Sequence, residues 1–258
     1  MDQWHWDAPA STIDEVIGRL GQIIDYCSVH YSPAAYFAVL YKKVTCKVRD
    51  RIAQHGFEDG ARMERLDVRF ANRYLEAFES WITGKPVTGS WAVAFQSVSN
   101  GRCIVLQHLL LGMNAHINLD LGIATCEVME GRVLEDLHPD FNAINSVLAA
   151  MTDSVKGCLT KINPLMKLLE LDIFNVDDLL VNFSIEVARD GAWDFATRLA
   201  ASQQGTDEQA CVQSRDLRVQ QLAGSLERPL GIGLRIIVWL IRLFERRKVR
   251  KIIAFLGE

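Results

Sequence analysis

The sequence lacks the features that mark several large classes of protein. It has no run of 18 or more uncharged apolar residues, so no segment is predicted to span a membrane. Its first residues, MDQWHWDAPAS, have no apolar core, and we expect no secretory signal and a cytoplasmic location. Basic residues are not in excess, because 28 Lys and Arg stand against 32 Asp and Glu, a net charge of −4. Nucleic-acid binders usually carry a basic face, so we expect no nucleic-acid partner.

Familiar catalytic and cofactor motifs are also missing. No GxSxG elbow, P-loop or GxGxxG is present, which argues against α/β serine hydrolases and against a nucleotide cofactor. No HExxH zinc motif occurs. The six cysteines show no CxxC spacing, and we expect them to be reduced, as in cytosolic proteins.

Helical periodicity extends over most of the chain. Apolar residues recur three and four positions apart, strand signals are few and no internal repeat is found. The helix predicted over 61–82 shows this spacing in four large side chains: Leu66, Phe70, Tyr74 and Phe78. Another helix is expected to begin at Asp177 and Asp178.

The predicted fold is therefore all-α, a single bundle of roughly eight to ten helices with short loops. We expect one domain over residues 1–258, with its core at 11–200. The C-terminal helices, at 207–256, are expected to pack on this core or to lie at its periphery. Residues 91–97 are expected to form a short strand or an irregular link.

The segment QHLLLGMNAHINLDLG places polar side chains within an apolar helix predicted over 102–128. Four of its residues are spaced four apart and so share one face of the helix: His108, Gly112, His116 and Asp120. A glycine inside a helix costs roughly 1 kcal/mol against alanine, and open space for a ligand would account for Gly112. A histidine and a carboxylate one turn apart often hold a divalent metal. We therefore predict a zinc or iron site at His108, His116 and Asp120.

Further polar residues are candidates to meet this face. Asp67 lies on the apolar side of an aromatic helix, where a carboxylate needs a cationic partner. Asp140 stands at the start of a later helix, a position that acids also favour for the helix dipole. Either aspartate is predicted to serve as a further metal ligand or as a general base. Glu186 and Arg189 are three apart and are expected to form an ion pair beneath Trp193.

Three functions remain open for this polar face, and the first is the leading hypothesis. It is a metal-dependent hydrolase in which a divalent ion activates water against an ester or phosphoester of an apolar or lipid-like substrate. The second is a metal-free cyclase or isomerase in which His108 or His116 acts as acid or base. The third is a non-catalytic network of hydrogen bonds between helices. The oligomeric state is left open.

The C-terminal segment 228–256 is both basic and apolar. Its apolar run Ile236–Ile241 is too short to span a bilayer. Two interpretations are open. The helix can pack on the bundle and keep its arginines in water, or it can act as an amphipathic segment that touches an anionic membrane.

Four segments, ERLDVRFANRYLEAF, QHLLLGMNAHINLDLG, DFNAIN and ARDGAWDFA, resemble a family of bacterial and fungal helical proteins known mainly as a domain of unknown function. The resemblance extends over about residues 30–200 and brings no established reaction. It implies that nine residues match family motif positions: Asp67, Asn72, His108, Asn114, His116, Asn118, Asp120, Asp140 and Arg189. The predicted catalytic residues among them are Asp67, Asn72, Asn114 and Asp140.

The spacing His116-x-x-x-Asp120 also resembles, more distantly, a half-site of zinc-dependent phospholipase C and the related single-strand nucleases. Those all-α enzymes hold three metal ions with histidines and carboxylates. They are secreted, bind metal through an N-terminal tryptophan and use more histidines than this chain offers. These differences argue against a full three-metal cluster and leave one or two metal ions open here, and the likeness is an analogy at the level of fold.

Overall fold

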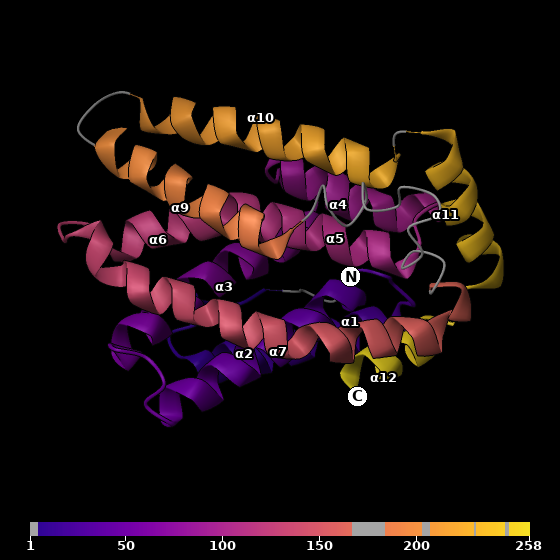
Figure 1. The fold of residues 1–258 in the computed structure, drawn as a ribbon, viewed down its shortest axis with the longest axis horizontal. Coiled ribbons are helices and arrows are strands. Elements are labelled where there is room, and N and C mark those ends of the chain that lie inside the picture. Colours follow the sequence, from indigo (N-terminus) through magenta and orange to yellow (C-terminus); the bar gives the residue numbers. More distant parts are fainter. Residues whose placement is uncertain (1–4, 167–183, 203–206, 230, 246–247) are drawn as a thin grey trace.

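The computed structural model describes residues 5–166, 184–202, 207–229, 231–245 and 248–258. These residues form an all-α bundle without strands, which confirms the predicted fold class (Figure 1). The first helices are α1 (Ile13–Val29), α2 (Ala35–Ala53), α3 (Gly60–Ile82), α4 (Gly89–Asn100) and α5 (Val105–Ala115). The next are η1 (His116–Leu121), α6 (Gly122–Val128), η2 (Leu134–Leu137) and α7 (His138–Ile162). The last are α9 (Ile185–Ser202), α10 (Glu208–Glu227), α11 (Ile232–Phe244) and α12 (Val249–Gly257).

Several helices begin where the sequence signals a start. The Thr12 hydroxyl accepts a hydrogen bond from the backbone N–H of Glu15 and so caps α1. Asp59 caps α3 in the same way, and Pro139 stands in the first turn of α7. The helix start expected at Asp177 and Asp178 falls outside the described residues.

Helices α5, η1 and α6 follow one another without a break and form the axis of the bundle (Figure 1). This central run packs most extensively on α2, α3, α4, α9 and α10. The approach to α9 is close, because a Cβ added at Gly122 would lie 2.5 Å from a ring carbon of Phe195. The central helix starts slightly later than the 102–128 predicted, and it contains a π-helical turn, η1.

The expectation of a strand or irregular link at 91–97 is wrong, because these residues belong to α4. The carboxylate of Asp216, on α10, accepts hydrogen bonds from the backbone N–H groups of Gly89 and Ser90 at 2.6 and 3.0 Å. It satisfies donors that the first turn of α4 leaves unpaired. Within α4, the rings of Trp91 and Phe95 stack with centroids 5.2 Å apart.

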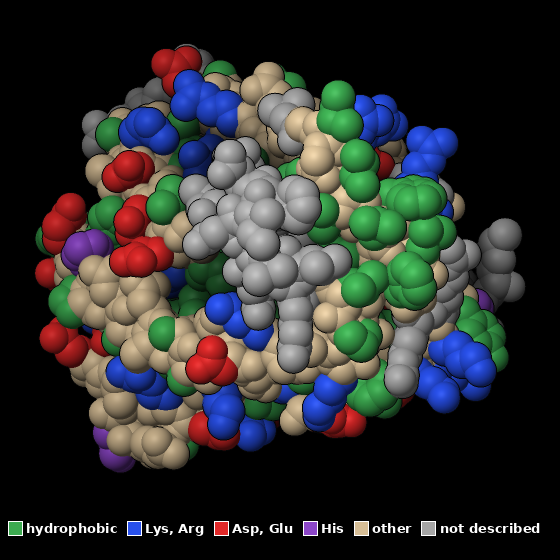
Figure 2. Space-filling view, turned by 45° about the vertical axis from the view of Figure 1, so that its right-hand side comes forward, with side chains coloured by type: hydrophobic (Ala, Val, Ile, Leu, Met, Phe, Trp, Pro, Cys, Tyr) green, Lys and Arg blue, Asp and Glu red, His purple; other side chains and the backbone are tan. Residues whose placement is uncertain are grey.

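The C-terminal helices have different positions. Helix α10 packs on α4 and α5, and α12 packs on α2 and α7. Helix α11 lies at one end of the bundle (Figure 1). Figure 2 brings that end forward and shows hydrophobic side chains gathered there. In the part of the chain that the structure describes, no helix has the length and apolar character needed to cross a membrane.

Candidate functional site

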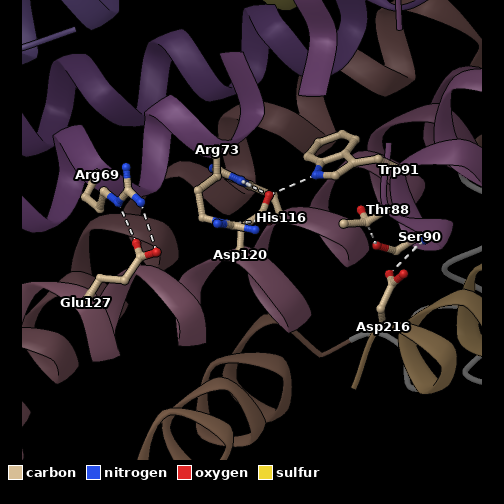
Figure 3. Close-up of polar contacts among 9 residues, drawn as sticks. All are labelled: Arg69, Arg73, Thr88, Ser90, Trp91, His116, Asp120, Glu127 and Asp216. Atoms are coloured by element: carbon tan, nitrogen blue, oxygen red, sulfur yellow. Dashed lines mark hydrogen bonds and ion pairs between the residues drawn. The ribbon is translucent and has the colours of Figure 1, made fainter. Parts of the chain in front are cut away.

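The π-helical turn lies at the centre of the polar segment. Such turns are rare and frequently mark functional sites. Here the turn brings the imidazole Nδ1 of His116 to 3.3 Å from the Oδ2 atom of Asp120. The carboxylate of Asp120 also accepts hydrogen bonds from Arg73 Nε at 3.0 Å and from Trp91 Nε1 at 2.9 Å (Figure 3). Asp120 therefore connects the central helix to α3 and α4, and its charge is paired with that of Arg73.

The ring of His116 is held in one orientation by aromatic neighbours. It stacks on Phe70 with centroids 3.6 Å apart, and Tyr41 meets it edge-on at 4.5 Å. Burial lowers the pKa of His116 below its usual value, although Asp120 acts in the opposite direction. A neutral ring beside the Asp120 carboxylate carries its proton on Nδ1, which leaves Nε2 as a proton acceptor. Nε2 is buried and has no hydrogen-bond partner among the described residues.

His116 lines an apolar cavity together with two other unsatisfied polar groups. One carboxylate oxygen of Asp67 and the hydroxyl of Tyr41 are buried without a hydrogen-bond partner among the described residues. The cavity is small, with a volume of about 90 Å³, and it is partly open to solvent. An unsatisfied buried polar group costs about 1–3 kcal/mol, so three of them around one cavity are the strongest sign of a binding site.

Burial changes the protonation of these groups. It raises the pKa of Asp67 to about 7, with a smaller contribution from the charge of Glu64. It also raises the pKa of Tyr41 well above its usual value, helped by the charges of Asp67 and Asp120. Near neutral pH the cavity therefore contains a carboxyl group that can hold or release a proton, and a tyrosine that keeps its proton.

Arg189 lines the same cavity, and the predicted ion pair with Glu186 is not among those formed by the described residues. Glu186 is exposed, whereas Arg189 is buried and donates from Nε to Asn145 Oδ1 at 2.7 Å. Its guanidinium also donates to the carbonyl oxygen of Phe141 and lies 4.3 Å from the centre of that ring. Burial lowers the pKa of Arg189 to about 10, so it is still a cation at neutral pH.

A second apolar cavity adjoins the first. The two share five lining residues: Leu40, Val44, Met113, Leu148 and Ile185. The second continues along α5 and α7, where Leu106, Leu109 and Leu159 line it. The polar groups of Asp67 and His116 therefore face one part of an extended apolar space.

His108 is not brought together with His116 and Asp120. It lines a separate small cavity, where its Nδ1 lies 3.2 Å from the Ser97 hydroxyl. Burial lowers its pKa to about 4. Within the described residues, no three His, Cys, Asp or Glu side chains form a group that could hold a metal ion. The metal site thus stays a prediction without a gathered set of ligands.

The sequence suggested that Gly112 leaves open space for a ligand, and this expectation is wrong. A Cβ at this position would lie 2.5 Å from the Cγ atom of Phe37. The Phe37 ring packs against the bare backbone there and lines both the cavity of His116 and that of His108. Gly112 therefore serves close packing between α2 and α5.

Gly112→Ala is expected to lower the free energy of unfolding by about 1–3 kcal/mol, because the added methyl group overpacks Phe37. The matched control is Gly18→Ala in α1, where an added Cβ meets nothing within 4 Å. That change should stabilise the protein by about 0.5–1 kcal/mol through helix propensity. Urea unfolding of both variants measures the difference. Equal stabilisation by both would show that Phe37 moves aside at no cost.

Two of the predicted catalytic residues hold loops and termini in place. The side chain of Asn72 forms two hydrogen bonds with the backbone of Ala10 and so attaches the N-terminal segment to α3. Asp140 accepts hydrogen bonds from the backbone of Glu58 and Asp59 and from the guanidinium of Arg62. These bonds outweigh the effect of burial and lower the pKa of Asp140. Among the described residues that line the cavity of Asp67 and His116, neither Asn72 nor Asp140 is found.

Asn114 and Asn118 form a network between the central helix and α10. Asn114 donates to the carbonyl oxygen of Val219 at 2.9 Å and accepts from Asn118 at 3.1 Å. Arg215 donates to the backbone carbonyl of Asn118 at 2.7 Å. This part of the polar segment fits the non-catalytic hypothesis, because its bonds are satisfied within the protein.

Sequence reasoning missed two members of the site. Tyr41 was not a candidate, since a single tyrosine in an apolar helix is normally part of the core. Trp91 was placed in a doubtful strand, so its bond to Asp120 could not be foreseen. The only sequence signal for either residue is the number of aromatic side chains in α2, α3 and α4.

Comparison with known proteins gives a family but no activity. No curated protein and no solved structure matches the chain. Residues 13–229 match a family described as a family of unknown function (DUF5995). The match is wider than the 30–200 expected and includes α10, while α11 and α12 lie beyond it. The chain therefore belongs to this family of unknown function.

Proposed function

We propose that the protein is an enzyme that catalyses proton transfer on an apolar small molecule bound in the cavity of Asp67 and His116, as in an isomerisation or a cyclisation. The observation that carries this proposal is the pair of unsatisfied groups, His116 Nε2 and the Asp67 carboxyl, at one apolar cavity. Perturbed titratable groups in such a cavity are typical of catalytic acids and bases.

The roles follow from the state of each group. His116 Nε2 takes a proton from the substrate, and the carboxylate of Asp120 stabilises the imidazolium that forms. Asp67, with a pKa of about 7, gives a proton to another atom of the substrate. The substrate loses one proton and gains one, so its composition is unchanged. Solvent then returns the proton from His116 to Asp67.

Arg189 and Tyr41 would orient the substrate. A buried cation on the cavity wall suits a polar or anionic substituent, and the Tyr41 hydroxyl can donate one hydrogen bond. The adjoining apolar cavity offers room for the rest of a hydrophobic molecule. A metal-dependent hydrolase is less well supported, because His108 lines a different cavity from His116.

The test is deuterium incorporation from heavy water into a panel of apolar compounds, including isoprenoids, fatty acids and their esters. Wild-type protein should label or convert at least one compound. His116→Gln and Asp67→Asn should each lose about 100-fold or more of that rate. His108→Gln, which changes a buried histidine outside the cavity, should keep it.

Metal content separates the hypotheses. Elemental analysis of protein purified without a metal column should find no stoichiometric zinc or iron, and a chelator should leave the rate unchanged. Stoichiometric metal that is lost in His116→Ala and Asp120→Ala, together with ester hydrolysis, would overturn the proposal in favour of the hydrolase. A rate in His116→Gln equal to that of wild type would also overturn it.

A further inference from the structure

Helix α11 exposes a row of large hydrophobic side chains. Five of them have between 50% and 77% of their surface in contact with solvent: Ile232, Ile236, Trp239, Leu243 and Phe244. The first four are spaced i, i+4, i+7 and i+11, so they form one stripe along the helix. The opposite side of α11 is buried against the bundle through Leu234, Ile237 and Ile241. The helix is thus apolar on two sides, and only one of them is covered (Figure 2).

The charges beside this stripe are mostly positive, although Glu227 lines the groove beside α11 and Glu245 stands at the end of that helix. Residues 232–244 contain no acid, and their two charged residues are Arg235 and Arg242. Arg228, just before the helix, is exposed, and so are Lys248 and Lys251 after it. Basic side chains at the edges of an apolar stripe match the layout of helices that lie in the interface of an anionic membrane.

Charge is distributed unevenly along the whole chain. Residues 228–258 hold eight Lys and Arg against Glu245 and Glu258, whereas the complete sequence has four more acids than bases. An excess of positive charge therefore accompanies α11 and the residues that flank it in the sequence. An anionic surface would attract this end of the molecule and repel the remainder, which fixes an orientation.

We propose that α11 docks the protein on an anionic lipid surface, with its axis in the plane of that surface. The stripe of Ile236, Trp239 and Leu243 enters the boundary between headgroups and acyl chains, where tryptophan is favoured. Arg235 and Arg242 contact lipid phosphates. The 13 residues of α11 are too few to cross the bilayer, so the contact is peripheral.

Co-sedimentation of the full-length protein with vesicles tests the docking. Vesicles of phosphatidylcholine and phosphatidylserine should bind it, those of phosphatidylcholine alone should bind far less, and high salt should reduce binding. The double variant Ile236→Ser with Trp239→Ser should bind about tenfold or more weakly. The charge variant Arg235→Gln with Arg242→Gln, which removes the two proposed phosphate contacts, should bind anionic vesicles more weakly and depend less on salt.

Matched controls keep the result specific. Val187→Ser with Leu217→Ser removes two equally exposed apolar side chains from α9 and α10, and it should bind like wild type. Circular dichroism confirms that each variant is folded. Wild-type protein that does not bind anionic vesicles would overturn the proposal. Equal binding by the Ile236 and Trp239 variant would do the same. A third outcome would also overturn it: wild-type protein that is a dimer and does not bind vesicles, together with an Ile236 and Trp239 variant that is a monomer. The stripe would then be a contact between copies of the chain.

Discussion

Between pH 4 and pH 8 the wild-type protein should lose about 4 kcal/mol of its free energy of unfolding through Asp67, and the Asp67→Asn variant should not show this loss. The carboxyl has its pKa raised from 3.8 to about 7 by burial, so the folded state holds a proton that the unfolded state has released in this range. In the wild-type protein, the stabilisation that the Asp67 carboxyl contributes is fully present below its unfolded pKa and is lost as the pH rises through about 7. Asparagine does not ionise, so the loss disappears.

Asp140→Asn provides a control of opposite sign. The pKa of Asp140 is lowered, so its stabilising contribution is present at neutral pH and is lost only as the pH falls through its folded pKa. This variant should be destabilised most at neutral pH. Urea unfolding between pH 4 and pH 8 measures the Asp67 series, and the Asp140 series extends below pH 4, where its contribution is lost. If the difference in free energy of unfolding between wild type and Asp67→Asn did not change with pH, Asp67 would titrate normally. The proposed role of Asp67 as an acid would then lose its physical basis.

Asp120→Ala should have the largest destabilising effect, about 3–5 kcal/mol, because it leaves the Arg73 charge partly buried and unpaired. The bond from Trp91 and the support of His116 are lost at the same time. Thermal and urea unfolding measure the loss. In the same variant, nuclear magnetic resonance should find the His116 ring no longer fixed in a single tautomer.

The ion pair of Arg69 with Glu127 gives a matched control between the same two helical runs (Figure 3). Arg69 lies one turn before Arg73 on α3, and Glu127 lies about two turns after Asp120 on the central run. Both of its side chains are more exposed than those of Arg73 and Asp120. Glu127→Ala should therefore cost about 0–1 kcal/mol. If Asp120→Ala cost no more than Glu127→Ala, the cluster around Asp120 would not hold the three helices together.

Local patterns were enough to predict most of the helices. The four-residue spacing of Leu66, Phe70, Tyr74 and Phe78 places α3 almost to its end residues. The start of α4 could not be predicted in this way, because the carboxylate that satisfies its first N–H groups comes from Asp216, far along the chain. A helix whose cap lies on another helix carries no sign of it in its own residues.

The candidate site was predicted in part. The burial of Asp67, His116 and Asp120 followed from their apolar surroundings, and the structure places all three in the core. Periodicity alone could not show which partners they would meet. Repeated spacings of four placed His108 and His116 on one face of the helix, two turns apart. The Phe37 ring from α2 packs against Gly112, midway along the chain between them. A glycine in a helix has the same appearance in sequence whether it makes room for a ligand or for a side chain.

The π turn has a consequence for the history of the family. Its hydrogen bonds join residues five apart rather than four, so the turn contains one residue more than an α-helix needs. A relative that lacks this inserted residue would have every later side chain of the central helix rotated by about 100°. The bundle could survive such a deletion, but the aspartate could no longer meet both the histidine and the arginine. The presence or absence of that one insertion would thus divide descendants that keep the contacts of Asp120 with His116 and Arg73 from those that retain only the scaffold.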